Sequence, residues 1–406
     1  MEDRFALGFR PITHGPAAGA IPERGGAAAA IASTAVIQPR APAWPGRART
    51  GTMERRMTQD AIPSHDPDFR VLVVTNMYPG PSAPEWGIFI ADQVRSLQEW
   101  LPVRVIAKRN RGSGAYLPFS LRSAWASLAG DFDLVHAHYG FHSALVPALF
   151  ASQPLVVTFH GSDALLEPRR HRLYARLQRR IVRRADRVIA VSGEVAARLI
   201  EELGAEPGKV AQIPCGVDTV LFRPGDRAAA RRALGIEPDA HLVLFVGRRS
   251  KMKGLELLRM AAARMPEVAF HFVGEGEIRW EAPNCRFWGA RPHAEIAEWL
   301  RAADVLALPS YSEGTPVTVL EALATERTVV CSRVGACPEL IAQARAGFLF
   351  EPGDVDGLVA GLREALSGGQ DLSVGRDLIK ERFDLAVIAK RLVSLYKEVA
   401  EEKGAR

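Results

Sequence analysis

Short runs of consecutive apolar residues recur along the chain from residue 70 onward. Such runs, without regular polar alternation, are typical of strands that are buried on both faces of a parallel sheet. Segments with helical spacing separate most of them, and this alternation predicts an α/β fold whose sheets are covered by helices on both sides. The expected strands lie at residues 70–75, 103–107, 134–137, 155–159, 188–191, 242–246, 269–273, 285–288, 305–308, 328–331 and 347–350.

The strands fall into two series, which predicts two Rossmann-like domains. The first series ends at 221–224, and the helical segment 227–235 leads into the second. We therefore expect an N-terminal domain over residues 67–224 and a C-terminal domain over residues 225–383. Ligands bind at the carboxyl ends of the strands in doubly wound sheets, so the expected site is a cleft between the two domains.

A helix is expected near the C-terminus, over residues 385–403, with Asp384 as its N-cap. The terminal segment, residues 384–406, is long enough to pack back on the N-terminal domain. The apolar positions of this helix have the spacing of one helix face; they are Ile388, Leu392, Leu395, Tyr396 and Val399.

Residues 1–66 differ from the rest of the chain, since they are rich in Ala, Gly, Pro and Arg and have no steady periodicity. This composition predicts disorder. The segment has no unbroken apolar core and does not resemble a secretory signal. Met53 or Met57 could serve as the start of the protein, because compact sequence begins only at Phe69.

The composition narrows the class of protein further. The chain has 406 residues, of which 48% are hydrophobic, which is enough for about two cores. No apolar run reaches the ~20 residues that span a bilayer. The four cysteines are scattered without a CxxC pair, so reduced thiols in a cytoplasmic protein are expected. The net charge of +6 is mild, and its local distribution matters more than its total.

One segment combines a helix start with two glutamates. Glu313 precedes the expected helix, Pro316 suits its first position, and Glu321 lies about 7.5 Å further along its axis. The free backbone amides and the dipole of a helix start attract an anion. The two carboxylates could therefore contact hydroxyl groups on either side of a bound diphosphate, as in a nucleotide-sugar. On spacing alone, an ordinary amphipathic helix with a glutamate in its first loop stays an open alternative.

This segment and its surroundings resemble the retaining GT-B glycosyltransferases of family 4, also called glycosyl transferases group 1. The family's E-x7-E signature corresponds to Glu313 and Glu321, and its G-R-x-x-x-x-K-G segment corresponds to residues 247–254. The resemblance extends roughly from Phe69 to the C-terminus. The matching segments stand in the family's order, at 159–163, 185–192, 213–222, 247–254, 272–276, 313–322 and 338–339.

The resemblance implies a GT-B fold, a retaining mechanism and a nucleotide-sugar donor. Arg248 and Lys253 are expected to bind the diphosphate that becomes the leaving group, because positive charge there stabilises the transition state. His160 is expected to contact the donor sugar near the reaction centre. These three residues and Glu313 are the implied catalytic residues. The implied donor-binding residues are Gly87, Arg248, Lys253, Gly274, Arg291, Glu313, Gly314, Thr315, Pro316, Val317 and Glu321.

Two positions depart from the family pattern. Cys215 stands where the family's N-G-V-D segment has Asn. Trp86-Gly87-Ile88 replaces a loop in which many relatives have two adjacent glycines. Gly87 is still expected to let the backbone approach the phosphates at a helix start.

No metal ion or other cofactor is expected, and the nucleotide-sugar is a co-substrate. Asp131 and Asp133 have the D-x-D spacing of a metal site in another glycosyltransferase fold, but they lead directly into a strand. His136 and His138 share a strand face and lack a third ligand, although His138 could face the cleft.

The segment 169–187 contains nine arginines around an apolar stripe formed by Leu173, Leu177 and Ile181. A basic amphipathic helix can bind an anionic membrane surface. A solvated helix that packs this stripe on the sheet is the alternative. Binding of nucleic acid is not expected, since interleaved aromatic residues are nearly absent.

The predicted activity is transfer of a hexosyl or N-acetylhexosaminyl group from a UDP-linked sugar to a polysaccharide, a lipid-linked acceptor or a small molecule. Such an enzyme would act in the cytoplasm, or peripherally at the inner face of the membrane, in the synthesis of cell-surface polysaccharide. Two alternatives keep the fold: a nucleotide-sugar epimerase or hydrolase, and a non-catalytic binding module. The second alternative predicts the loss of at least one implied catalytic residue, and all four are present.

Overall fold

The computed structural model describes residues 66–81, 83–110, 112–170 and 172–405. All of them belong to one compact unit, Ala61–Arg406. The segment predicted to be disordered lies outside the described residues except for Asp66. The Asp66 carboxylate pairs with Lys397 Nζ at 2.9 Å, so this end of the predicted segment is held by the C-terminal helix.

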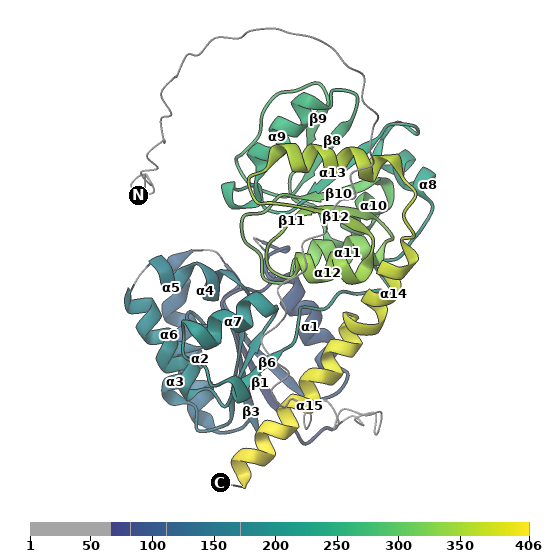
Figure 1. Ribbon diagram of the computed structural model, residues 1–406. Helices are drawn as coiled ribbons and strands as arrows, with labels where there is room; N and C mark the ends of the chain where they lie inside the picture. Colours follow the sequence, from purple (N-terminus) through teal and green to yellow (C-terminus); the bar gives the residue numbers. More distant parts are fainter. Residues whose placement is uncertain (1–65, 82, 111, 171, 406) are drawn as a thin grey trace, which may run out of the picture. The chain divides into compact units, whose positions relative to one another are not determined.

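The described residues form two six-stranded sheets in which all paired strands run parallel (Figure 1). The first sheet has the order β2-β1-β3-β4-β5-β6. It comprises β1 (Val71–Thr75), β2 (Val103–Ala107), β3 (Leu134–His138), β4 (Leu155–Phe159), β5 (Arg187–Ala190) and β6 (Val210–Gln212). The second sheet has the order β12-β11-β10-β7-β8-β9. It comprises β7 (Leu242–Val246), β8 (Ala269–Val273), β9 (Cys285–Phe287), β10 (Val305–Leu308), β11 (Thr328–Ser332) and β12 (Gly347–Phe350).

The predicted α/β fold with two doubly wound sheets is confirmed. Eleven of these strands lie within one residue of their predicted bounds, and most of them are apolar runs that the fold buries. Strand β6 was not predicted. It has three residues, lies at the edge of the first sheet and is at least partly exposed throughout, so it has no apolar run that could mark it.

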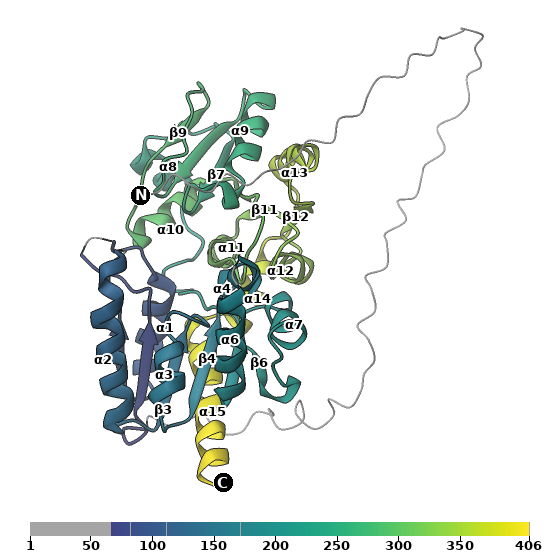
Figure 2. The same ribbon diagram turned by 90° about the vertical axis from the view of Figure 1, so that its left-hand side faces the viewer.

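Helices cover both faces of the first sheet, and we call this sheet with its helices the first lobe. On one face, Val71 and Val73 pack against α1 (Ile88–Gln98) and α15 (Leu385–Gly404). Several helices cover the other face (Figure 2), and Leu72 and Val74 share an apolar cluster with their residues. These helices are α2 (Tyr116–Ala129), α3 (Leu145–Phe150), α6 (Arg172–Arg184) and α7 (Gly193–Glu201), with the short helices α4 (Ser162–Leu165) and α5 (Glu167–Arg170) between β4 and α6.

Helix α15 returns to the first lobe from the end of the second series. The Asp384 side chain accepts a hydrogen bond from the Ala386 amide at 2.9 Å, which is the expected N-cap. The Val217 amide donates to the Phe383 carbonyl at 2.8 Å, and the Leu385 amide donates to the Val217 carbonyl at 3.1 Å. The start of α15 is therefore fixed to the segment that leaves the first sheet.

The second sheet and its helices form the second lobe around one apolar cluster. Its helices are α8 (Arg227–Leu234), α9 (Leu255–Arg264), α10 (His293–Ala302), α11 (Val317–Ala324), α12 (Cys337–Ala344), α13 (Val355–Ser367) and α14 (Ser373–Arg382). Short 3-10 turns are η2 (Ser113–Ala115), η3 (Pro207–Lys209) and η4 (Lys251–Lys253). In the described part of the chain, no helix combines the length and apolar character needed to cross a bilayer.

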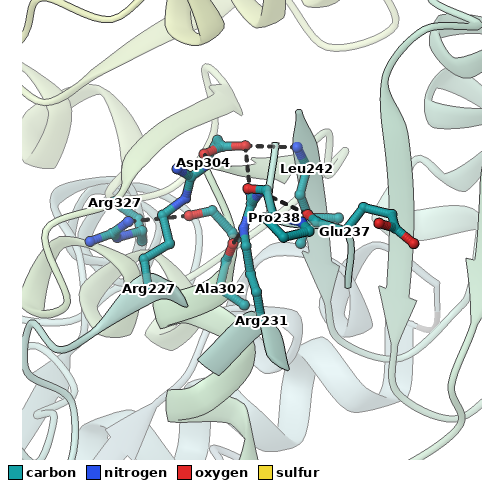
Figure 3. A network of polar contacts seen from close by, with 9 residues as sticks. Arg227, Arg231, Glu237, Pro238, Leu242, Ala302, Asp304 and Arg327 are labelled. Atoms are coloured by element: carbon teal, nitrogen blue, oxygen red, sulfur yellow. Dashed lines mark hydrogen bonds and ion pairs between the residues drawn. The ribbon is translucent and has the colours of Figure 1, made fainter. Parts of the chain in front are cut away.

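A polar network fixes the amino ends of β7 and β10 (Figure 3). Buried Arg231 donates to Asp304 Oδ2 at 2.9 Å and to the Ala302 carbonyl at 2.9 Å. The Leu242 amide donates to the same carboxylate at 2.8 Å, and Arg227 also pairs with it. The buried charges are paired and hydrogen-bonded. The network therefore holds the amino ends of these two neighbouring strands in place and leaves their carboxyl ends free of it.

Each sheet contains a point at which the chain reverses the direction of strand addition. In the first sheet this switch point lies between β1 and β3, and in the second it lies between β7 and β10. Ligands of doubly wound sheets bind beside the carboxyl ends of the strands at such points. The residues that follow these four strands are therefore the first place to look for a site.

Candidate active site

The loops that follow β7 and β10 lie together at the switch point of the second sheet. Gly254 has φ 66°, and a Cβ there would lie 1.9 Å from the Pro309 carbonyl oxygen. The Tyr311 amide donates to the Met252 carbonyl at 2.9 Å. Glycine alone tolerates both the left-handed backbone and such a close approach to a carbonyl oxygen. Gly254, which follows Lys253, therefore allows the two loops to pack together.

This approach places Lys253 against Glu313. Lys253 Nζ lies 2.6 Å from Glu313 Oε1, and the two side chains are 30% and 10% exposed. Arg248 is exposed on the loop after β7. Its charge favours ionisation of Tyr139 in the first lobe, while burial of that ring is the larger effect and raises the pKa of Tyr139. Two of the implied catalytic residues are thus in direct contact, and a third lies within electrostatic reach of the other lobe.

Glycines at the ends of β7 and β8 allow these backbones to approach each other. A Cβ on Gly274 would lie 2.0 Å from the Gly247 carbonyl oxygen. The Gly274 amide donates to the Gly289 carbonyl at 2.7 Å. Gly274 therefore shapes the strand ends through its backbone. Arg291 follows this segment, is half-buried and forms no hydrogen bond or ion pair within the described residues.

In the first lobe, His160 directly follows β4 and is held by a buried carboxylate. Asp163 accepts hydrogen bonds from the amides of His160 at 2.9 Å, Gly161 at 3.0 Å and Gly140 at 2.8 Å. Burial raises the pKa of Asp163 to about 6, while these amide bonds favour its charged form. Asp163, the last residue of the matching segment 159–163, is therefore a positioning residue for His160, a role that the sequence did not assign.

His160 lies within a small group of aromatic and polar side chains. Its Nε2 lies 3.0 Å from His138 Nδ1, and its Nδ1 lies 3.9 Å from Cys215 Sγ. The ring of Tyr139 lies 4.8 Å from the His160 ring. Tyr139 has φ 79°, which is uncommon for a residue with a side chain. His138 is fully buried, so it supports His160 and does not face a ligand.

Burial keeps these histidines neutral. It lowers the pKa of His160 well below its usual value, with a smaller contribution from His138, and it lowers the pKa of His138 to about 3. Burial also raises the pKa of the Cys215 thiol to about 12. Near neutral pH the group therefore consists of two neutral imidazoles and a thiol, and His160 can form hydrogen bonds without carrying charge.

The two lobes meet at a contact that glycines make possible. A Cβ on Gly161 would lie 2.8 Å from the Gly314 nitrogen, and one on Gly314 would lie 2.1 Å from the His160 carbonyl oxygen. Gly335, with φ 56°, approaches the backbone carbonyl oxygen of Glu313, which a Cβ would meet at 2.5 Å. His160 and Glu313 come from different lobes, and each adjoins this backbone contact.

The helix start that follows this contact also packs on the first lobe. The Thr315 hydroxyl donates to the Val191 carbonyl, and Val317 packs against the apolar cluster of the first sheet. Helix α11 begins at Val317, so Pro316 is its N-cap and not its first residue as predicted. Thr315 and Val317 therefore have backbone groups, and not their side chains, available for a ligand.

Gly87 is the N-cap of α1, in agreement with its predicted place at a helix start. Its φ is 75°, and a Cβ there would lie 2.7 Å from the Met77 carbonyl. The loop that follows β1 therefore passes close to the start of α1. That Gly87 lets a donor phosphate approach stays a prediction.

Glu321 lies in an unexpected series of charged side chains. It is buried in α11, and its Oε1 lies 2.7 Å from His293 Nε2 at the start of α10. His293 Nδ1 lies 3.5 Å from Asp92 Oδ2 on α1 of the first lobe. Sequence reasoning missed both His293 and Asp92, because no motif marks them. The nearest signal is that His293 stands two residues after Arg291.

The carboxylates around His293 have a larger combined effect on its pKa than its burial has. Burial lowers the pKa of His293, but Glu321, Asp92 and Asp218 raise it, and the net direction is upward. Burial raises the pKa of Asp92, while His293 and Arg95 act in the opposite direction. A protonated His293 is therefore stabilised by carboxylates from both lobes.

Three of the four residues weighed as metal ligands, Asp133, His136 and His138, have other partners. His136 lies 2.6 Å from the Tyr396 hydroxyl through Nδ1 and 2.7 Å from Thr158 Oγ1 through Nε2. Asp133 accepts a hydrogen bond from the Arg70 amide at 2.6 Å. Across the described residues, no group of three or more His, Cys, Asp or Glu side chains could hold a metal ion.

Sequence comparisons match both lobes to described families. Residues 65–221 match the family described as Glycosyltransferase Family 4, and residues 240–368 match Glycosyl transferases group 1. The D-inositol 3-phosphate glycosyltransferase of Kribbella flavida is 30% identical over 380 residues, which covers 79% of this chain and 88% of that protein. D-inositol 3-phosphate glycosyltransferase 2 of Catenulispora acidiphila is 31% identical over 311 residues, which covers 68% and 73% of the two chains.

Solved structures share the fold. Sucrose-phosphate synthase from Thermosynechococcus elongatus aligns with a TM-score of 0.68 at 20% identity, covering 81% of this chain and 98% of that one. Anabaena HepE in complex with UDP and glucose aligns with a TM-score of 0.67 at 21% identity, covering 81% and 100%. Together with the family matches, these alignments confirm the resemblance that the motifs indicated. The chain belongs to glycosyltransferase family 4 and is a glycosyltransferase with the GT-B fold.

Proposed function

We propose that this enzyme is a retaining glycosyltransferase that moves a hexosyl or N-acetylhexosaminyl group from a UDP-linked sugar to a hydroxyl acceptor. The observation that carries the proposal is the Lys253–Glu313 pair beside the Gly161–Gly314 contact. There a cation and a carboxylate of the second lobe stand next to the strand end that bears the neutral His160.

The cationic side of the site is suited to a leaving diphosphate. Departure of a nucleoside diphosphate develops negative charge on the oxygen that was bonded to the sugar, and a fixed cation stabilises that charge. Lys253 supplies a point charge, and Arg248 supplies a planar fork that can bind two phosphate oxygens. The start of α11 adds free amides and the positive end of a helix dipole. On donor binding, Lys253 would exchange the Glu313 carboxylate for phosphate.

The other side of the site is suited to the sugar. Glu313, once released from Lys253, can accept hydrogen bonds from sugar hydroxyls, and His160 can form a neutral hydrogen bond near the anomeric carbon. Asp163 is the carboxylate next to His160, but it is occupied by backbone amides and is no nucleophile. We therefore propose attack on the same face of the sugar, with the departing phosphate oxygen accepting the proton of the acceptor hydroxyl.

The names of related proteins support the donor and suggest one acceptor. The HepE structure contains UDP and glucose, which supports a UDP-linked donor. The relatives named D-inositol 3-phosphate glycosyltransferases make a phosphorylated polyol one candidate acceptor, beside a lipid-linked or polysaccharide acceptor of the cell surface. The proposed location is the cytoplasm, because all four cysteines are free thiols, as in a reducing compartment.

A screen of donors and acceptors tests the proposal. The purified protein is incubated with UDP-, GDP- or ADP-linked hexoses and with D-inositol 3-phosphate or membrane extract, and products are identified by mass spectrometry. We expect a glycosylated acceptor from a UDP-sugar, and NMR should show that the anomeric configuration is retained. Free sugar or an epimerised donor without a glycosylated product would support a hydrolase or an epimerase. Donor binding without turnover would support a non-catalytic module.

A substitution at the lysine tests the site itself. We expect Lys253→Ala to lower kcat/KM by about 10²-fold or more, because a fixed cation at the leaving group is lost. Lys251→Ala is the matched control, since Lys251 is exposed in the same 3-10 turn. Equal rates for the two variants would remove Lys253 from the mechanism.

A further inference from the structure

Helix α2 carries an exposed apolar stripe on the side that faces away from the first sheet. Its members are more than 60% exposed: Leu117 69%, Leu121 62%, Trp125 64% and Leu128 66%. Their spacing places them within about 80° of the helix circumference, at about 100° per residue. The residues that α2 buries lie on the opposite side; they are Phe119, Ser123, Ala126 and Ser127.

The apolar surface continues over the neighbouring helices. Helix α3 packs against both α2 and α6, as the two views of the first lobe also show (Figures 1 and 2). It exposes Leu149 and Phe150, and α6 exposes Leu173. Seven of the 13 large apolar side chains that are exposed in the described residues therefore lie on these three helices. Single exposed apolar residues are ordinary, but such a concentration marks an interaction surface.

The same three helices contain no Asp or Glu, and α2 and α6 carry arginines. Arg122 lies on α2, and α6 has arginines on its exposed side: Arg172, Arg176, Arg179, Arg180 and Arg183. Arg187, at the end of the basic segment noted in the sequence, is different. It is buried, and it pairs with Glu398 at 2.9 Å and Glu402 at 2.6 Å on α15.

The apolar stripe predicted on α6 packs mainly on the sheet. Ile181 is buried and Leu177 is half-buried, so Leu173 is its exposed member. The alternative stated for this segment, a helix that packs its stripe on the sheet, therefore holds for most of its apolar side. Helix α6 contributes charge to the surface, and α2 contributes most of the apolar area.

A groove between α2 and the edge strand β2 adds further cations. It is lined by Arg104, Arg109, Arg122 and Trp125, among other residues. The Arg104 guanidinium lies 5.9 Å from the centre of the Trp125 ring. Trp residues favour the headgroup level of a membrane, where one edge of the ring is apolar and the other is wet. Nearby guanidinium groups can bind lipid phosphates.

We propose that α2, α3 and α6 form a docking surface for an anionic lipid bilayer. The leucines and Trp125 of α2 would enter the boundary between headgroups and acyl chains, and the arginines of α6 would bind acidic headgroups. Charge disfavours two other occupants. A second copy of the chain would present the same cations, and residues 1–65 contain eight arginines against five acidic residues. The inference goes beyond the proposed reaction and does not depend on it.

Vesicle binding tests the proposal with the full chain and without any donor. Flotation is measured with phosphatidylcholine vesicles, with and without phosphatidylglycerol, at low and high salt. We expect binding that requires phosphatidylglycerol and weakens with salt. Leu121→Glu and the double variant Arg176→Glu/Arg180→Glu should each lower the partition coefficient by about tenfold or more. Val220→Glu is the matched control, since Val220 is 77% exposed in the loop after β6.

Three different results would contradict the proposed bilayer docking. The proposal fails if the wild-type chain does not bind anionic vesicles, or if Val220→Glu weakens binding as much as Leu121→Glu. It also fails if sedimentation velocity shows a dimer that Leu121→Glu dissociates while vesicles are not bound, because the surface then joins two copies. Circular dichroism of each variant verifies its fold, and the exposure of Leu121 makes unfolding unexpected. None of these results would bear on whether the enzyme transfers a sugar to a soluble acceptor.

Discussion

The two glutamates of the E-x7-E motif occupy very different surroundings. Glu313 lies in a loop, pairs with the partly exposed Lys253 and adjoins the backbone contact between the lobes. Glu321 lies within α11, where its side chain is 4% exposed and pairs with His293. A ligand can therefore replace the lysine at the first carboxylate, whereas the second is enclosed by protein.

Helix geometry explains the difference. Each residue of α11 adds about 1.5 Å of rise, so Glu321 is carried away from the switch point and toward α10. There His293 is held from the other side by Asp92 of the first lobe. We infer that the two ends of the motif act differently: Glu313 acts on the donor, and Glu321 acts through a contact that depends on how the lobes meet and on pH.

The largest expected effect is at Glu313. Glu313→Gln removes the charge that pairs with Lys253 and would weaken the hydrogen bonds that we propose between Glu313 and the donor sugar. We expect kcat at saturating donor to fall by about 10²–10³-fold, with a change in Tm of only a few degrees, because a partly exposed ion pair contributes about 1 kcal/mol or less. Glu277→Gln is the control, since Glu277 is exposed on the loop after β8. Similar rates for both variants would place Glu313 outside the reaction.

The next effect concerns the contact that joins His160 to Glu313. Gly314→Ala would place a Cβ 2.1 Å from the His160 carbonyl oxygen, so the backbone must move. We expect a loss of about 10²-fold in kcat/KM, since misplacement by about 1 Å can have this effect. Gly208→Ala is the control, because a Cβ there meets nothing within 4 Å. Full activity of Gly314→Ala would show that the contact is absent during catalysis.

A smaller, pH-dependent effect is expected at His293. Because the pKa of His293 is raised in the folded protein, its paired form stabilises the fold fully below the usual value of 6.5. That stabilisation is lost as pH rises through the raised pKa. We expect His293→Asn to raise the donor KM by about tenfold below that range, and the difference from wild type to shrink at alkaline pH.

Donor KM and thermal unfolding, each measured across pH, test this expectation for His293. The variant keeps Phe222, whose ring lies 5.0 Å from the His293 ring, so that only the imidazole changes. Two observations would contradict the role: a wild-type pH profile that persists in His293→Asn, or a loss that is equal at every pH. A loss equal at every pH would indicate a purely steric role.

The smallest effect is expected at Cys215. The Cys215 sulfur lies 3.9 Å from His160 Nδ1, which is a weak contact, and burial raises the pKa of the thiol to about 12. We expect Cys215→Asn, which restores the residue typical of the family, to alter kcat by about threefold at most. Alkylation of Cys215 by iodoacetamide in the folded enzyme should also be slow at neutral pH. Rapid alkylation, or a large change in kcat, would mean that this thiol takes part in the reaction.

Much of the fold could be predicted because its signals are local. A buried parallel strand is an apolar run, and most of the eleven strands placed within one residue are of this kind. The N-cap Asp384 and the apolar face of α15 are likewise contained in adjacent residues. Strand β6 could not be found in this way, since its pairing with β5 places it and its own residues are at least partly exposed.

The site was predicted in part for a similar reason. The resemblance identified Lys253 and Glu313, which are 60 residues apart in the chain. It did not show that they are in contact, because the contact requires β7 and β10 to be neighbours in the sheet. The positioning role of Asp163 and the contacts of His293 were missed. Each depends on groups brought together from separate segments, and no short pattern records them.

The sequence by itself determined two series of buried strands, the glycines and charged residues at their ends, and hence the class of enzyme. Only the tertiary structure decided which carboxylate meets a lysine and which meets a histidine. It also decided that the leucines of α2 face outward, whereas the apolar residues of α6 mostly face the sheet. Both decisions depend on packing between segments that are distant in the chain, and apolar spacing reveals a helix face without showing what covers it.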